Sequence, residues 1–195
     1  MKFDMKRLTK IDKRYLMVFI VCIAATNVAT FTLASAYYER FAFAPIERVG
    51  IITVQIKRAG ETEWTTICIV KNLLTNGGKD FIKTQLGTSA NASKVIYISL
   101  STSSSSPDAT WTNIPTEITN NGLERAEGTY TSLGTGNWKI EKTFTATGTH
   151  TGVKLTGLSW DADGNGGGLL ACATITTTDL SANDQLKITW TQTVS

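Results

Sequence analysis

The sequence predicts an all-β fold, an antiparallel β-sandwich or jelly roll with one short helix, behind an apolar N-terminal segment. Three observations lead to this prediction. Thr, Gly and Ser are abundant, and aromatic residues stand singly among β-branched ones, a composition typical of strands and turns. Strand-like runs recur at short intervals between turn residues. Long helical periodicity is absent, so an antiparallel sandwich fits better than an α/β scheme.

Residues 1–36 have the features of a secretory signal. Residues 1–14 carry six basic and two acidic side chains, and residues 15–25 are continuously apolar. A core of this length suits a signal peptide, whereas a membrane span needs about twenty apolar residues. The Ala-Ser-Ala triplet at 34–36 matches a signal peptidase site and would leave Tyr37 first. We favour cleavage over a retained membrane anchor. Both place the body outside the cytoplasm, because the basic end stays inside.

A type IV prepilin also has a basic leader followed by an apolar helix. Prepilin peptidases usually require Gly or Ala before that helix, but residues 12–14 are Asp-Lys-Arg. The prepilin interpretation therefore fits poorly.

The exported body is predicted to be one sandwich domain, residues 49–195, preceded by an arm, residues 37–48. The chain after residue 36 is long enough for one domain with a real core. From Tyr37 onward it carries thirteen Lys/Arg and fourteen Asp/Glu, a net charge near −1. A body of this charge has no basic patch for nucleic acid.

The first elements of the body are a hairpin and a helix. Residues 49–58 and 64–72 are strand-like runs joined by Ala-Gly-Glu-Thr-Glu, which predicts a β-hairpin. The next segment predicts the helix, with Asn76 capping its first amides and Gly87 ending its last turn. Its predicted buried stripe is Phe81, Ile82 and Leu86.

The remaining strands follow in order. Residues 95–100 are continuously apolar, which predicts a strand covered on both faces. Residues 138–146 and 184–194 alternate with period two, which predicts half-exposed antiparallel strands. Residues 153–160 and 168–176 flank a Gly-rich turn and bring the count to between seven and nine strands. The residues predicted to face inward are Trp138, Ile140, Phe144, Ala146, Leu186, Ile188, Trp190 and Val194.

Enzymatic chemistry is not predicted. The single histidine, His150, lies in a turn-like sequence, and a serine or cysteine hydrolase needs a base. One His with dispersed carboxylates does not make a histidine-based metal site, and no Gly-rich nucleotide motif precedes a helix. A two-carboxylate glycosidase site has no sequence signature and stays open. We therefore expect a protein that is not an enzyme.

The cysteines divide between the signal and the body. Cys22 lies in the signal core, which leaves Cys68 and Cys172 in the exported part. An even pair in an oxidising compartment favours a disulfide between an early and a late strand. Two buried free thiols are the alternative, because both cysteines sit in apolar strand patterns.

Two further motifs are candidate sites. Asp161, Asp163 and Asn165, followed by Gly166, match the opening half of a calcium loop. The acid expected at the twelfth position is missing, and a Gly/Asp-rich hairpin turn accounts for the same residues. Because of the partial match, calcium is the one candidate cofactor. Asn91 opens an Asn-Ala-Ser glycosylation sequon, which matters only in a host that glycosylates exported proteins.

Several short motifs stand at residues 70–82, 97–110, 122–130, 142–146 and 184–190. With them, the chain from Val70 to Ser195 resembles a class of small β-sandwich modules of phage tail and virion proteins, also found in archaeal genomes. In that class an Asn-Leu-Leu-Thr segment leads into a short helix, and a Leu-x-Ile-Thr-Trp strand closes the domain. The resemblance implies fold more than function. The export signal sets this chain apart and favours a cell-surface role.

The arm is a candidate donor strand. Tyr38, Arg40 and Ala42 alternate with Phe41 and Phe43, and Pro45 ends the alternation before the hairpin. Arms of this kind polymerise subunits by completing a neighbour's sheet, and the overall plan resembles archaeal and bacterial surface filament subunits. The alternative is an arm that folds back on its own domain as an edge strand. The predicted subunit contacts are Tyr37, Tyr38, Phe41, Phe43 and Ile46.

The sequence therefore favours an exported structural protein, a subunit of a pilus-like extracellular filament. Its partners would be copies of itself, and it would contact the membrane only through the N-terminal segment before processing. A virion or tail-type structural module is the second hypothesis. The third is a membrane-anchored glycan- or calcium-binding sandwich that uses residues 161–168 and the loop at 101–111.

Overall fold

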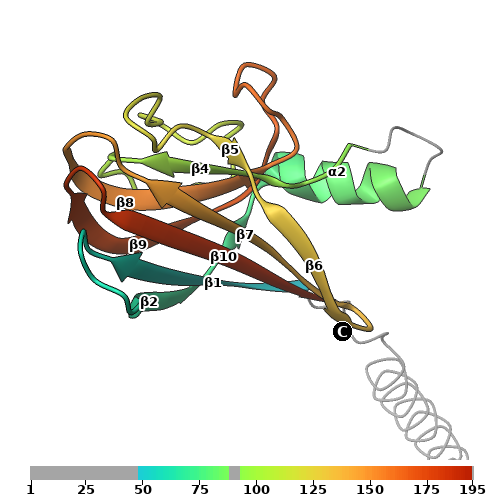
Figure 1. Ribbon diagram of the computed structural model, residues 1–195. Coiled ribbons are helices and arrows are strands. Elements are labelled where there is room, and N and C mark those ends of the chain that lie inside the picture. The colour runs from blue at the N-terminus through green and yellow to red at the C-terminus, as the bar shows by residue number, and fades with distance from the viewer. Residues whose placement is uncertain (1–47, 88–92, 195) are drawn as a thin grey trace, which may run out of the picture. The chain divides into compact units, whose positions relative to one another are not determined.

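The computed structural model describes residues 48–87 and 93–194 (Figure 1). The predicted signal, Asn91 and all of the arm except Arg48, which opens β1, lie outside these residues. Within the described part of the chain, no helix is both long and apolar enough to span a bilayer. The elements are β1 (Arg48–Lys57), β2 (Thr65–Lys71), β3 (Leu73–Leu74), α2 (Asn76–Gly87), β4 (Tyr97–Ser101), β5 (Ala126–Glu127), β6 (Thr129–Gly134), β7 (Asn137–Thr145), β8 (His150–Ser159), β9 (Leu169–Leu180) and β10 (Gln185–Val194).

The described strands form two five-stranded sheets, which confirms the predicted all-β antiparallel class. The first sheet has the order β2-β1-β10-β7-β6, and the second has the order β3-β9-β8-β4-β5. Every strand pair is antiparallel. Figure 1 shows β4 and β8 of the second sheet lying over β7 and β10 of the first. The predicted hairpin of residues 49–72 is the pair β1 and β2.

The core lies between the two sheets, where the predicted alternation places it. Trp190 of β10 is fully buried between Ile52 of β1 and Ile140 of β7, its neighbours in register. The alternation fails only at the end of β10. Val194 is 42% exposed and its predicted inward role is wrong, because it is the last residue of the strand. Gln192, two residues earlier on the same face, is fully buried.

Strand β4 is covered on both faces, as predicted. Ile98 and Leu100 face the core and are fully buried. The opposite face carries Ser99 and Ser101, also fully buried, under the long connection from β4 to β5. The Ser101 hydroxyl donates to the Pro115 carbonyl in that connection. At β4, the outer face of the second sheet is therefore closed by this loop.

Helix α2 has the predicted span but a different cap and a narrower buried face. The amide of Gly78 donates to Thr75 Oγ1 at 2.9 Å, so Thr75 caps the helix rather than Asn76. Phe81 stacks on the Trp160 ring with centroids 4.4 Å apart. The predicted burial of Leu86 is wrong, because Leu86 lies in the last turn of the helix and is 82% exposed.

The sequence reasoning missed β5 and β6. These strands are consecutive in the chain but belong to different sheets, with only Gly128 between them. A signal for the β6–β7 hairpin was present in Gly-Thr-Gly-Asn (134–137), a turn-type sequence between β6 and a clearly alternating strand. The chain reverses direction there between β6 and β7, and Gly134 and Gly136 both have positive φ.

Candidate functional site

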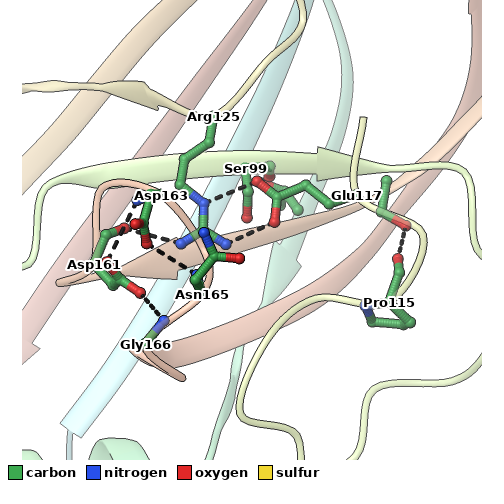
Figure 2. Close-up of polar contacts among 10 residues, drawn as sticks. Ser99, Pro115, Glu117, Arg125, Asp161, Asp163, Asn165 and Gly166 are labelled. Atoms are coloured by element: carbon green, nitrogen blue, oxygen red, sulfur yellow. Dashed lines mark hydrogen bonds and ion pairs between the residues drawn. The ribbon is translucent and has the colours of Figure 1, made fainter. Parts of the chain in front are cut away.

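A polar cluster lies between the β4–β5 connection and the turn after β8 (Figure 2). Arg125 and Glu117 form a two-pronged ion pair, with Nε to Oε1 at 2.8 Å and Nη2 to Oε2 at 2.6 Å. The two side chains are only 5% and 17% exposed. The third guanidinium nitrogen, Nη1, donates to the main-chain carbonyl of Asp161 at 2.9 Å. The cluster therefore ties the Gly-rich turn to the loop that covers the second sheet.

The predicted calcium residues lie in this turn, and their side chains bond to the turn itself. Asp161 Oδ2 accepts from the Gly166 amide at 2.7 Å, and Asp163 Oδ1 accepts from the Asn165 amide at 2.9 Å. Hydrogen bonds from Asn165 lower the pKa of Asp163, because they favour the charged carboxylate. The contact between Asp163 and the Asn165 amide is that of an Asx turn, which Asp and Asn form in loops.

A metal site needs several ligand groups that converge on one point. Within residues 48–87 and 93–194, no group of three or more His, Cys, Asp or Glu side chains could hold an ion. Glu117, the acid beside the turn, is already paired with Arg125. The hairpin-turn interpretation thus accounts for the contacts that Asp161 and Asp163 make with amides of the turn itself (Figure 2).

The structure does not form the predicted disulfide, since Cys68 and Cys172 are both free thiols. Cys68 Sγ accepts from the amide of Thr176 in β9 at 3.4 Å. Cys172 lies four residues earlier in the same strand, a distance of about 13 Å along it. A disulfide needs Cα atoms roughly 4–7 Å apart. Cys172 is fully buried, and burial raises the pKa of its thiol to about 11.

The sequence suggested that the single histidine lies in a turn, but the structure places it in a strand. His150 is the first residue of β8, pairs in register with Leu180 and is 8% exposed. Its Nε2 atom has no hydrogen-bond partner among the described residues. This environment is that of a residue packed at the end of a sheet.

The other notable surface is the free edge of the first sheet. Among the described residues, β6 pairs only with β7. All six residues of β6 are exposed, including Tyr130 at 59% and Leu133 at 51%. A groove of about 470 Å³ opens where β6 begins. The residues that line it are Lys94, Ile96, Glu127, Gly128, Thr129 and Tyr130.

The predicted subunit contacts in residues 37–46 and the sequon at Asn91 lie outside the described residues, so they remain predictions. No protein-family model, curated protein or solved structure matches the chain. The function proposed below is therefore inferred from the chain's own residues.

Proposed function

We propose that this protein is an exported, non-enzymatic structural protein, a subunit of an extracellular filament that assembles by β-strand donation. Residues 37–46 act as the donor strand, and the partners are copies of the same chain. The observation that carries the proposal is β6, an edge strand whose six residues are all exposed. An unpaired edge offers a row of main-chain donors and acceptors to an incoming strand.

The composition of the arm supports this proposal. A strand added to an edge gains affinity from main-chain hydrogen bonds and specificity from alternate side chains. Phe41 and Phe43 are two residues apart, so they fall on one face of an extended chain. Arg40 and Ala42 fall on the other face. An arm with one aromatic face suits a sheet edge that exposes Tyr130.

The polar cluster supports a structural role rather than a catalytic one. The side chains of Arg125, Glu117 and Asp161 are all occupied by contacts within the protein. Contacts of this kind hold loops in place. A virion or tail-type module would use the same edge, but the signal-like segment at residues 1–36 favours a surface filament.

The first test is the state of the native protein at the cell surface. The N-terminal sequence and intact mass would be determined, and ultracentrifugation and electron microscopy would show whether the protein is polymeric. We expect a first residue of Tyr37 in material that pellets as filaments. A chain that starts at Met1 and is found as a monomer in the membrane fraction would overturn the proposal.

A further inference from the structure

The point where the chain leaves one sheet for the other defines a corner of the sandwich. β5 pairs with β4 in the second sheet, and β6 pairs with β7 in the first. Gly128, between them, donates its amide to the Ile96 carbonyl at 2.8 Å. A Cβ atom at Gly128 would lie 2.7 Å from Ile140 Cγ2 and 3.3 Å from that same carbonyl. The corner therefore requires glycine, and it brings the segment before β4 alongside the start of β6.

Beyond this corner, β6 pairs with β7 on one side, and no described strand pairs with its other side. Alternate residues of a strand direct their main-chain groups to the same side. Because the Gly128 amide points to Ile96 and away from β7, Tyr130 and Ser132 also direct their amides and carbonyls away from β7. No described residue pairs with them. The free edge is about 20 Å long at the rise of a strand.

The groove lies along the first half of this edge. Tyr130 pairs in register with the buried Ile140, yet it is 59% exposed. It forms one wall of the groove, with Ile96 at the corner. Lys94 and Glu127 add one charge of each sign to the lining. An aromatic side chain placed beside Tyr130 would find apolar contact there.

The other sheet edges are less suited to a donor. β3 and β5 are each two residues long. On the outer side of β2, the Ile67 carbonyl already accepts from Thr176 Oγ1 at 3.3 Å. Among the described strands, β6 alone combines length, full exposure and an adjoining groove.

We propose that the outer edge of β6 and this groove receive residues 37–46 of a second copy of the chain, with Phe41 and Phe43 on the side of Tyr130. This inference rests on the filament function proposed above and specifies the receiving site. The ten residues 37–46 are long enough to cover the six residues of β6. Its aromatic face would then cover Tyr130, and Arg40 and Ala42 would lie on the solvent side with Thr129 and Thr131.

Hydrogen–deuterium exchange on the mature protein tests this site. Pelleted polymer and the unassembled fraction of the same preparation would be compared at residue resolution. We expect the amides of Tyr130 and Ser132 to exchange at least roughly tenfold more slowly in the polymer. The amides of β2 serve as the internal reference and should exchange equally in both fractions.

Three other outcomes would overturn the inference. Fast exchange of β6 in both fractions would mean that another site receives the arm, while the filament function stands. Slow exchange of β6 in both fractions would mean that the edge is covered within a single chain. Absence of any polymer would overturn the proposed function and this inference together.

A pair of variants separates side-chain recognition from main-chain pairing. Phe43→Ala should raise the concentration needed for assembly roughly 10- to 100-fold, because it removes an aromatic group from the interface. Arg40→Ala, on the opposite face, should change it less than about threefold. Equal effects of the two substitutions would contradict the proposed orientation of the arm.

Discussion

Removal of the Arg125 guanidinium should strongly destabilise the domain. In Arg125→Met, the Glu117 carboxylate loses both of its charge-assisted hydrogen bonds, and the Asp161 carbonyl loses one donor. The Glu117 side chain is only 17% exposed, so water cannot fully replace the lost contacts. Uncompensated charge of this kind is the costliest result of breaking an ion pair.

The expected loss follows from burial. Removing one partner of a buried pair costs about 3–5 kcal/mol. For a domain of this size, each kcal/mol shifts the melting temperature by about 2–4 °C, so the melting temperature should fall by about 6–20 °C. The ion pair of Lys83 and Asp80 supplies a matched control, because its contact is also 2.6 Å but its side chains are 75% and 71% exposed. Lys83→Met should change stability little, since water screens that pair.

Chemical denaturation of the three proteins, with circular dichroism as the signal, measures these differences. A double variant, Arg125→Met with Glu117→Leu, should regain most of the loss, because no unpaired charge remains. If Arg125→Met and Lys83→Met lowered the free energy of unfolding equally, the reasoning from burial would be refuted. A double variant no better than Arg125→Met would show that the cost comes from lost packing instead.

Three further predictions concern single groups. Burial alone raises the pKa of Asp184, but two main-chain amides and Arg58 outweigh it and leave the pKa lowered. The contribution of the Asp184 carboxylate to the free energy of unfolding is therefore complete above the unfolded pKa of about 4, and it is lost as pH falls through the lower folded pKa. Acid titration should therefore destabilise the wild type more steeply than Asp184→Asn. At pH 8, a thiol reagent followed by mass spectrometry should label Cys68 first and reach buried Cys172 only on unfolding; an unlabelled pair would mean a disulfide. Gly78→Ala should undock α2 and lower the melting temperature, because its Cβ would lie 2.2 Å from a β9 carbonyl; an unchanged melt would contradict the tight docking.

Sequence reasoning was most successful where side-chain period alone decides the outcome. The inward residues of β7 and most of those of β10 were predicted correctly. Polar and apolar residues alternate in these two strands, so only one face of each can be buried. It failed where a tertiary neighbour decides. Gln192 is buried and Leu86 is exposed because of what lies around them, not because of their own types. Helix capping by Thr75 depends equally on β9, since the same hydroxyl donates to the Leu169 carbonyl at 2.6 Å.

The polar cluster was beyond sequence reasoning for a related reason. Arg125 lies eight residues from Glu117 and 36 from Asp161, and neither spacing is a recognisable motif. The Asp-rich turn was visible in the sequence, but its partner was not. Only the fold of the β4–β5 connection over the second sheet brings the guanidinium to the turn (Figure 2). The motif that resembles half of a calcium loop is, in this structure, a turn whose Asp161 carbonyl accepts a hydrogen bond from Arg125.

Strand β6 lacks the features that usually protect a free sheet edge. Natural sheets protect their edges with Lys, Pro, very short strands or covering loops. The strand Thr-Tyr-Thr-Ser-Leu-Gly has no charge and no proline, whereas β3 and β5 are short and β2 is bonded across to β9. An edge with high β-propensity and no protection is a liability for a monomer, because any exposed strand could add to it. In a polymer the same edge would be covered in every subunit except the last, so the absence of protection would carry little cost.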